Sequence, residues 1–572
     1  SEKVVMPSFE LEINGANVIE ESERSGRARS LFWPWAGANV SLLALSYGAF
    51  FLGFGISFWQ ATIAAFVGTI GSFLLVGISS LAGKRSNAPT MVLSRASFGV
   101  KGSRLPGALS YLIFVGWETV LISLATLATG TVFARVGGID RNLALLLGFT
   151  LAATLTVVGG VLGLKVIMKL QKFLTITIST MTLLYIALTI ENVSWSAVTD
   201  IPNGSFQSFV GATIFAVTGI GLGWVNAAAD YSRYLPRTVS NKSVVGWTVL
   251  GASIVPIILV IYGAALSGSS KNLSEAISMD PIGALTTLLP TWFLIPFAVA
   301  AILGLVGGAI LNLYSSGLTL VSLGVPIKRY QAASIDALIM FGGAIYIVWV
   351  ADNFFYPFQG FLITLGVPVA VWSSIFVADV LMRKKGYNEQ DLFDAQGIYG
   401  SVNKGSIALM ILFLHGIEDF SILRGDTLRN PAFFEADGLK TFDCVIANPP
   451  FSLQDWGEEN WVNDPYGRNI AGVPPKSNGD MAWVQHMIKS MNSTGRMTVV
   501  LPHGALFRKN AEGKIRKALI EQDLLEAVIG LGANIFYGTQ LAACVLIFRQ
   551  NKEASKKKKV LFIKQWNHWQ LE

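Results

Sequence analysis

Long apolar runs dominate the first two thirds of the chain and end near residue 383. Ten of these runs are long enough to cross about 30 Å of hydrocarbon as helices. We expect the ten spans at 35–57, 58–82, 106–134, 142–164, 170–190, 207–228, 243–267, 291–323, 332–351 and 354–382. The pattern therefore predicts a mostly α, polytopic membrane protein with a ten-span core at residues 34–383.

Positive charge alternates between successive connections. Basic residues gather in the even-numbered connections and after the last span, at 83–105, 165–172, 229–242, 324–331 and 383–385. The odd-numbered connections 191–206 and 352–353 carry acids and no base. Because loops rich in Lys and Arg stay on the cytoplasmic side, we expect a multi-pass protein of the cytoplasmic (inner) membrane. Both ends of the membrane part, including the tail at 1–33, are then cytoplasmic.

Ten spans divide into two sets of five, and a repeat with an odd number of spans must insert in inverted orientation. In such 5+5 inverted-repeat transporters, the first helix of each half is interrupted near the midplane and its free backbone groups hold a ligand or ion. Glycines cluster at Gly48–Gly55 in span one and at Thr218–Trp224 in span six, which includes Gly221 and Gly223. These clusters predict either interruptions that bind a substrate or close helix packing by small residues.

One acidic residue, Glu118, lies near the centre of a span. A carboxyl group at that depth is costly and is usually functional or paired. We expect Glu118 either to bind an N–H edge of a heterocyclic substrate or to carry a coupling proton. The alternative is a neutral carboxyl group that bonds to a neighbouring helix. Asp336 and Asp379 lie nearer the ends of their spans, so we expect solvent at the interface to stabilise them.

Three further residues of the spans can bind a flat heterocycle. Trp117 and Trp224 lie away from the interfaces, and an indole face gains by stacking on a planar ring. Asn312 offers both a donor and an acceptor for the edge of such a ring. Packing of the two indoles and an amide bridge between helices are the alternatives.

Several stretches resemble the nucleobase–cation symporter-1 family, specifically its purine/cytosine permeases. The resemblance covers about residues 20–410, and its motifs lie at Gly83–Gly99, Val115–Thr119, Ala229–Pro236, Tyr387–Asp394 and Tyr399–Asn403. It implies a ten-helix core with two further C-terminal helices, and cation-coupled uptake of a purine or pyrimidine base across the lipid bilayer. Its substrate aromatics fall on Trp117 and Trp224, and its amide falls on Asn312.

The coupling cation is expected to be a proton rather than sodium. Sodium-coupled members of the family use hydroxyl groups on span eight before the amide, whereas Phe297–Gly308 offers none. A proton carried by Glu118 is the interpretation we favour, with no further cofactor for transport.

The character of the sequence changes near residue 412. The whole chain is 52% hydrophobic and 14% charged, but all four His and both Cys follow residue 410. We expect a linker and a truncated eleventh helix at 384–411, a partial α/β domain at 412–550 and a basic tail at 551–572. Its strands and helices are expected at 443–447, 481–491, 496–501, 512–522, 525–530 and 543–549. The two Cys lie far from any CxxC pair, so we expect neither a metal site nor a disulfide framework.

The chemical signal of this second part is Asn448-Pro449-Pro450-Phe451, directly after a strand. An adenine flipped out of DNA needs acceptors for its exocyclic amine and an aromatic ring for its face. The Asn448 side chain and the Pro449 carbonyl can accept, Pro450 adds rigidity and Phe451 can stack. A plain tight turn is the alternative.

Together with that motif, this part resembles the M subunit of type I restriction–modification systems, a DNA adenine-N6 methyltransferase that uses S-adenosylmethionine. The matching stretches lie at His415–Leu428, Phe442–Phe451, Asp464–Arg468, Gly495–Phe507 and Asn534–Thr539. The resemblance implies DNA and restriction–modification subunits as partners, and Asp426 as a contact to the adenosine part of the methyl donor.

The sequence also departs from that family. The glycine-rich loop of the form Asp-Pro-x-x-Gly-Thr-Gly-Gly, which cradles the methionine part of the donor, does not occur in it. We therefore expect that S-adenosylmethionine is not bound and that this part is inactive alone. The run Lys556–Lys559 either touches DNA phosphate or forms a solvated tail.

Three interpretations of the whole chain remain. The one we favour is a nucleobase symporter that carries an inactive methyltransferase fragment, because the elements of the transport site are all present. The second is DNA adenine-N6 methylation by the C-terminal part. The third is an accidental chimera without joint function, since the join cuts both families within a domain rather than at a linker.

Overall fold

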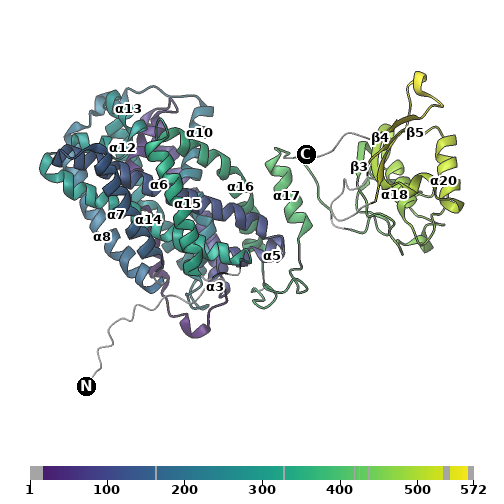
Figure 1. Cartoon of the computed structure of the whole chain (residues 1–572), viewed down its shortest axis with the longest axis horizontal. Coiled ribbons are helices and arrows are strands. Elements are labelled where there is room, and N and C mark those ends of the chain that lie inside the picture. Colours follow the sequence, from purple (N-terminus) through teal and green to yellow (C-terminus); the bar gives the residue numbers. More distant parts are fainter. Residues whose placement is uncertain are drawn as a thin grey trace. The chain divides into compact units, whose positions relative to one another are not determined.

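The computed structural model describes residues 17–161, 164–325, 327, 329–384, 386–417, 419–423, 425–435, 438–532 and 541–564. The chain divides into two compact units, Ser1–Asp419 and Phe420–Glu572 (Figure 1). The first half of the predicted N-terminal tail and the motif at Asn534–Thr539 lie outside the described residues.

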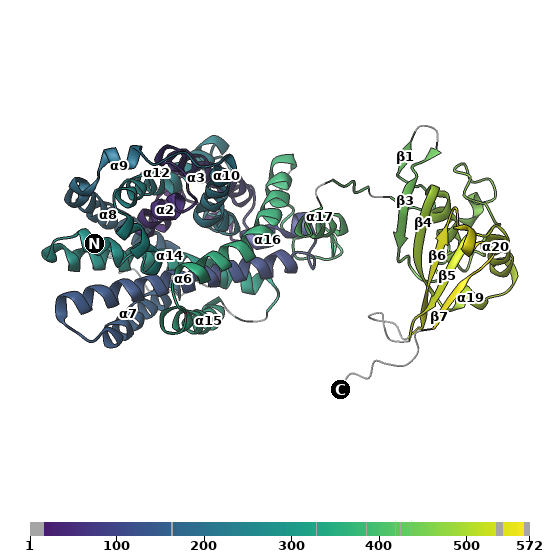
Figure 2. The same cartoon turned by 90° about the horizontal axis from the view of Figure 1, so that it is seen from above.

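The first unit is helical throughout (Figure 2). Its long helices are α3 (Phe58–Arg85), α6 (Arg104–Gly137), α7 (Arg141–Val161), α8 (Leu164–Thr189), α12 (Asn241–Gly268), α14 (Thr291–Ser322), α15 (Arg329–Trp349) and α16 (Phe355–Met382). Its shorter helices are α1 (Phe32–Asn39), α2 (Leu43–Leu52), α4 (Thr90–Leu93), α5 (Arg95–Phe98), α9 (Trp195–Thr199), α10 (Phe206–Ala216), α11 (Ala228–Ser232), α13 (Lys271–Met279) and α17 (Lys404–Leu414).

Within the described residues, nine helical segments are long and apolar enough to cross a membrane. The pair α1 and α2, bent by 64° at its break, makes ten when it is taken as one span. Large apolar side chains cover the outside of the bundle; Leu183 is 68% exposed and Leu338 is 70% exposed. An apolar outer face of this kind suits contact with lipid. The predicted polytopic, mostly α architecture is confirmed.

The helices cross closely where glycines remove side chains. Gly48 of α2 faces α12, and a Cβ there would lie 2.0 Å from the Ala264 nitrogen. Gly263 of α12 faces α2 in return, with a Cβ position 1.9 Å from the Leu45 carbonyl oxygen. Gly48 is therefore a packing residue. Of the two interpretations of the Gly48–Gly55 cluster, close packing therefore holds at Gly48, and the helix is interrupted earlier, between Asn39 and Leu43.

Several basic connections meet at one end of the bundle. Arg237 forms ion pairs with Glu21 at 2.8 Å and with Glu389 at 2.8 Å. The Lys84 ammonium donates to the Asn241 side chain at 2.6 Å, and an Arg85 guanidinium nitrogen donates to the Val380 carbonyl at 2.7 Å. The loops after α3, α11 and α16 and the segment before α1 therefore share one side of the first unit.

The second unit contains a mixed five-stranded sheet in the order β3-β4-β6-β5-β7. The strands are β3 (Phe442–Ala447), β4 (Met491–Pro502), β5 (Leu525–Gly530), β6 (Ala543–Arg549) and β7 (Leu561–Lys564), with a separate hairpin β1 (Phe434–Glu435) and β2 (Gly438–Leu439). The helices are α18 (Asp480–Lys489), α19 (Gly504–Phe507) and α20 (Asn510–Glu521). The predicted partial α/β domain is confirmed.

The hydrogen bonds of this sheet leave β3 at an edge. β3 runs parallel to β4, β4 and β5 both run antiparallel to β6, and β5 runs parallel to β7. Apolar residues of α18, such as Val484 and Ile488, pack with Met497 and Val499 of β4 in the core. Among the described residues β3 has a strand neighbour on one side only, and its Ile446 is 75% exposed.

Candidate functional site

A cavity lies where two interrupted spans meet in the first unit. Its empty space is about 650 Å³, part of it open to solvent. It is lined by Ala38, Asn39, Ser41, Leu43, Ala44, Tyr47, Trp117, Leu121, Thr218, Gly219, Ile220, Gly223, Trp224, Pro256 and Asn312.

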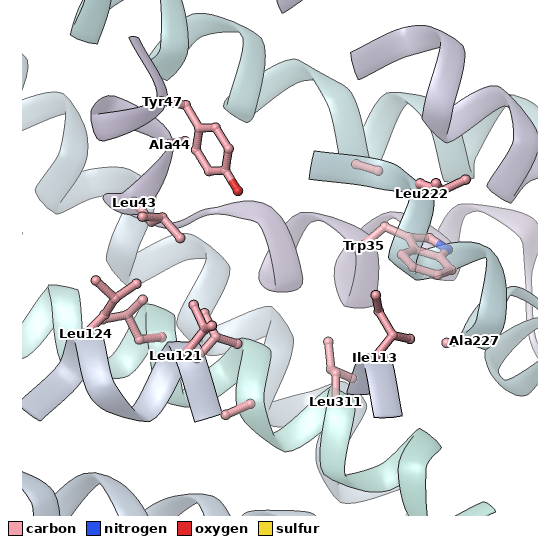
Figure 3. Close-up of a cluster of buried hydrophobic side chains, with 14 of the residues drawn as sticks. Trp35, Leu43, Ala44, Tyr47, Ile113, Leu121, Leu124, Leu222, Ala227 and Leu311 are labelled. Atoms are coloured by element: carbon pink, nitrogen blue, oxygen red, sulfur yellow. The ribbon is translucent and has the colours of Figure 1, made fainter. Parts of the chain in front are cut away.

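The first wall is the break between α1 and α2. After Asn39 the backbone leaves the helix, and α2 starts at Leu43 in a new direction. The Asn39 side-chain nitrogen donates to the Trp35 carbonyl at 2.8 Å, and the Ser41 hydroxyl accepts the Leu43 N–H at 3.3 Å. Figure 3 shows Trp35 and Tyr47 on the two sides of this break, with Leu121 across from them. The short polar side chains stabilise an irregular backbone that borders the cavity.

The second wall is the distorted middle of span six. After α10 the chain runs as a π-helix over Val217–Gly221 and then as a 3-10 helix over Leu222–Ala227. The predicted interruption of this span at the glycine cluster is therefore present. The Tyr47 hydroxyl donates to the Gly219 carbonyl at 2.7 Å and links this wall to α2.

The two glycines that we singled out in this span differ in their surroundings. Gly223 lines the cavity, and a Cβ there would lie 3.2 Å from the Trp117 ring nitrogen. Gly221 does not belong to the lining. A Cβ on it would lie 2.1 Å from the Ser72 hydroxyl oxygen, so Gly221 allows span six to pack against α3.

Both predicted tryptophans face the cavity. The Trp224 ring meets Trp35 edge-on with 5.9 Å between centroids. Trp117 meets Phe358 and Phe361 edge-on at 5.6 Å and 5.8 Å. These edge contacts fix the rings at their rims, and both indoles contribute to the cavity lining.

The amide of Asn312 lies on a third wall, formed by α14. Its side chain is 3% exposed, and its nitrogen donates to the Gly308 carbonyl one turn earlier at 2.9 Å. Trp117, Trp224, Asn312 and Gly223 thus come together around one cavity.

Glu118 lies outside that lining. Its side chain is fully buried, and neither carboxyl oxygen has a hydrogen-bond partner among the described residues. It lies within electrostatic range of Asp336 and beside the Ser316 hydroxyl, which donates to Asp336 at 2.7 Å. Asp336 is itself fully buried. The expectation that interfacial solvent stabilises Asp336 is therefore wrong.

Another buried amide occupies the crossing of α1, α8 and α14. Gln171 of α8 donates from its side-chain nitrogen to the Gly307 carbonyl at 2.8 Å. Its oxygen lies against α1, where a Cβ on Gly37 would be 2.2 Å away, and it has no hydrogen-bond partner in the part of the chain that the structure describes.

In the second unit, the Asn448–Phe451 motif directly follows β3. Asn448 and Pro450 are exposed, and Pro449 is buried. The next residue, Ser452, has a φ of 50° and donates its N–H to the Asp480 carboxylate at 2.8 Å. Asp480 is fully buried and forms an ion pair with Arg508 at 2.8 Å. Asp480 and Arg508 therefore hold the turn that presents Asn448 to solvent.

The residues present do not fit a bound S-adenosylmethionine. The carboxylate of Asp426 accepts the N–H groups of Leu428 at 3.2 Å and Arg429 at 3.0 Å, and so caps its own turn. The glycine-rich loop is missing from the sequence, and within the described residues no strand pairs with the outer edge of β3. Among the described residues, none forms a cradle on the methyl-donor side of the motif.

Comparison with known proteins connects the cavity with a family. Residues 18–417 match the family described as permeases for cytosine/purines, uracil, thiamine and allantoin, which is more than half of the chain.

The chain belongs to this permease family.

The permease is 26% identical over 395 residues to YxlA of Bacillus subtilis, which is named as a purine-cytosine permease. That alignment covers 67% of this chain and 82% of YxlA. Its fold resembles that of Mhp1, described as a nucleobase-cation-symport-1 family transporter in a closed conformation with bromovinylhydantoin bound. The TM-score is 0.57 at 20% identity over 72% of this chain and 90% of Mhp1. The predicted family and transporter fold are confirmed.

The C-terminal part of the permease has different relatives. Residues 374–572 match the N-6 DNA methylase family. The chain is 37% identical over 177 residues to the methylase subunit of the type I restriction enzyme MjaVII from Methanocaldococcus jannaschii. That match covers 29% of this chain and 30% of the subunit. The HindI methylase subunit of Haemophilus influenzae is 35% identical over 159 residues, with 27% and 34% covered. The chain thus spans about a third of the methylase subunits that it matches.

Sequence reasoning missed several residues of the cavity. Asn39, Tyr47 and Thr218 line it, and Asp336 is buried beside Glu118. A signal existed for Asn39, since a lone amide in the apolar run of span one needs a partner. Tyr47 carried no such signal, because a tyrosine in an apolar run is also a common packing residue.

Proposed function

We propose that this permease takes up a planar nucleobase, such as cytosine or a purine, across the cytoplasmic membrane by symport with a proton. The observation that carries the proposal is that Trp117, Trp224 and Asn312 line one cavity, on three different walls, at the meeting of two interrupted spans.

The chemistry of the lining suits such a substrate. An indole face gains by stacking on a flat, polarisable ring. The Asn312 side chain carries a donor and an acceptor, which together can read one edge of a base. The irregular backbone at Asn39–Ser41 and at Gly219 borders the cavity, as expected for the interrupted spans of inverted-repeat transporters. Substrate binding through Trp117, Trp224 and Asn312 follows from these properties.

A proton is the coupling ion that the residues favour. The stretch of α14 before Asn312, from Phe297 to Gly308, has no hydroxyl group to ligate sodium. Gln171 already uses the Gly307 carbonyl, at the crossing of α1 and α14. Glu118 supplies an ionisable group within the span that also carries Trp117.

Uptake of radiolabelled cytosine, adenine and hypoxanthine by transport-deficient cells tests the proposal. We expect saturable uptake by the full chain, and a strong loss in Trp117→Ala and in Asn312→Ala at equal membrane abundance. Trp59→Ala is the matched control, because Trp59 is 60% exposed on the outside of α3. Uptake that survives both cavity substitutions, or that falls equally in the control, would argue against this cavity as the binding site.

The membrane orientation can be tested with a native thiol. Cys444 is exposed and Cys544 is buried in the second unit. With both ends of the membrane part in the cytoplasm, as the basic loops predict, a membrane-impermeant maleimide should label Cys444 only in permeabilised cells. Labelling of Cys444 in intact cells would reverse the orientation.

For the second unit we propose that it does not transfer methyl groups by itself. The turn that presents Asn448 is formed, which favours descent from an adenine methylase, but Asp426 caps its own turn and no glycine-rich loop is present. Incubation of the purified full-length chain with tritiated S-adenosylmethionine and DNA tests this. We expect no label in the DNA, with an intact type I methylase as the positive control. Labelled adenine would establish the enzyme instead.

A further inference from the structure

We infer that Glu118 and Asp336 form a carboxyl pair that binds the coupling proton directly behind the wall of the substrate cavity. The inference rests on the proposed function and extends it, because it assigns a partner residue and a route between proton and substrate. The carboxyl pair is defined here as these two side chains, on α6 and α15.

The two carboxyl groups have unequal surroundings. Asp336 accepts hydrogen bonds from the Tyr111 hydroxyl and from the Ser316 hydroxyl, the latter at 2.7 Å. Neither oxygen of Glu118 has a hydrogen-bond partner among the described residues, although the side chain is fully buried. Donors stabilise a carboxylate, and a buried carboxyl group without donors is stable only when protonated. Asp336 is therefore the charged member of the pair and Glu118 the protonated one.

The pair holds one proton because both groups cannot be ionised together. A charged side chain inside the hydrocarbon region is costly, and two like charges within electrostatic range add to that cost. Helix α6 packs against α7, α14, α15, α16 and the irregular part of span six. The titratable groups from these elements that interact with the pair are Tyr111, Glu118 and Asp336 themselves. No basic side chain from the described part of these elements neutralises it, so a proton must.

The chain connects this proton to the cavity in two places. Glu118 directly follows Trp117, whose ring lines the cavity from α6. Ser316 lies one helical turn after Asn312 on α14, and it donates to Asp336. A substrate that moves Trp117 or Asn312 thus shifts a neighbour of the carboxyl pair. Loss of the proton would in turn leave two charges that must separate, which moves α6 relative to α15. Glu118 and Asp336 act as positioning residues for Trp117 and Asn312 rather than as contacts to the substrate.

The experiment compares two modes of transport in proteoliposomes that contain the full chain. Uptake driven by a pH gradient needs net movement of a proton, whereas exchange of labelled for unlabelled cytosine at equilibrium does not. We expect Glu118→Gln and Asp336→Asn to lose accumulation above equilibrium and to keep exchange. Asp379→Asn is the matched control, because Asp379 pairs with Arg383 at 2.6 Å at the end of α16. Accumulation that survives in both variants overturns the carboxyl pair and leaves the proposed function standing.

A second readout does not depend on transport. The infrared C=O stretch of a protonated carboxyl group should be present in the purified wild-type chain at neutral pH and absent from Glu118→Gln. Its absence from the wild type overturns the inference even if the chain transports nothing. No exchange or uptake by the wild type, with the carboxyl band present, would instead contradict the proposed function alone.

Discussion

The Tyr47 hydroxyl donates to the Gly219 carbonyl at 2.7 Å and so joins the second half of the broken first span to the distorted middle of span six. The two residues are 172 positions apart in the chain and line the same cavity. The Tyr47 ring also packs against Phe50 and Phe215, with 5.8 Å and 5.6 Å between centroids. The ring thus belongs to the core and the hydroxyl belongs to the site.

The change Tyr47→Phe separates these two roles. It keeps the ring and removes one buried hydrogen bond, worth about 0.5–1.5 kcal/mol. We expect a small fall in the thermal midpoint of the detergent-purified chain and a clear rise in KM for uptake, since the Gly219 carbonyl loses its partner beside the cavity. Tyr346→Phe on α15, where the side chain is 54% exposed, should change neither quantity. An unchanged KM in Tyr47→Phe would separate this hydrogen bond from transport.

A second prediction concerns the crossing of α2 and α12. In Gly263→Ala the new methyl group would lie 1.9 Å from the Leu45 carbonyl oxygen, so the helices must move apart. Overpacking of this kind typically costs about 1–3 kcal/mol or more. We expect low membrane abundance and an early thermal transition. Gly246→Ala, on the same helix, meets no atom within 4 Å and should be neutral or slightly stabilising. Equal stability of the two variants would contradict this crossing.

A third prediction concerns the coupling ion. Replacement of sodium by choline in the uptake medium should leave both KM and the maximal rate unchanged, because Gln171 uses the Gly307 carbonyl and the stretch Phe297–Gly308 of α14 offers no hydroxyl group. A protonophore should abolish accumulation in either medium. Uptake that requires sodium would contradict proton coupling.

A fourth prediction concerns pH and the second unit. Burial lowers the pKa of His486 to about 4, and the positive charge of Arg468 adds to the shift. In the unfolded chain the imidazole binds a proton near pH 6.5. Between about pH 6.5 and pH 4 the unfolded state therefore binds more protons, and the second unit loses stability as the pH falls through this window. Above pH 6.5 neither state is protonated, so the effect vanishes.

Brief proteolysis of the full-length chain in urea can measure this effect. The urea midpoint for cleavage within the second unit should fall from pH 7 to pH 5 in the wild type and fall less in His486→Gln. The same fall in both proteins would assign the pH dependence to other groups.

Hydropathy and loop charge were sufficient to predict the spans, since a helix in lipid must be apolar over its whole length. They could not locate the break in span one. Glycine serves both as an interruption and as a contact point, and Gly48 is a contact point only because α12 crosses there. The distortion at Gly219–Gly223 was predictable because several glycines cluster there, in the first helix of the second half.

The sequence indicated Trp117, Trp224 and Asn312, which line the cavity, but it could not give the surroundings of Glu118. Neighbours on a helix point about 100° apart, so the position of Trp117 in the sequence does not decide whether Glu118 also faces the cavity. Only the packing of α15 against α6 decides what Glu118 meets. Asp336 was expected at the membrane interface because it lies near the end of its span. That position gives no information about the hydroxyl groups of α6 and α14 that donate to it.

Within the described part of the second unit, the outer edge of β3 pairs with no strand, and this bears on how copies of the chain meet in a membrane. A strand edge with unpaired backbone groups can add a strand from another chain, and Ile446 beside it is 75% exposed. Chains that are confined to a bilayer meet one another in two dimensions, so their edges meet far more often than those of a dilute soluble protein. Self-association through β3 would therefore increase steeply with the expression level of the chain. The substitution Ile446→Lys should weaken this association and leave the membrane spans unchanged.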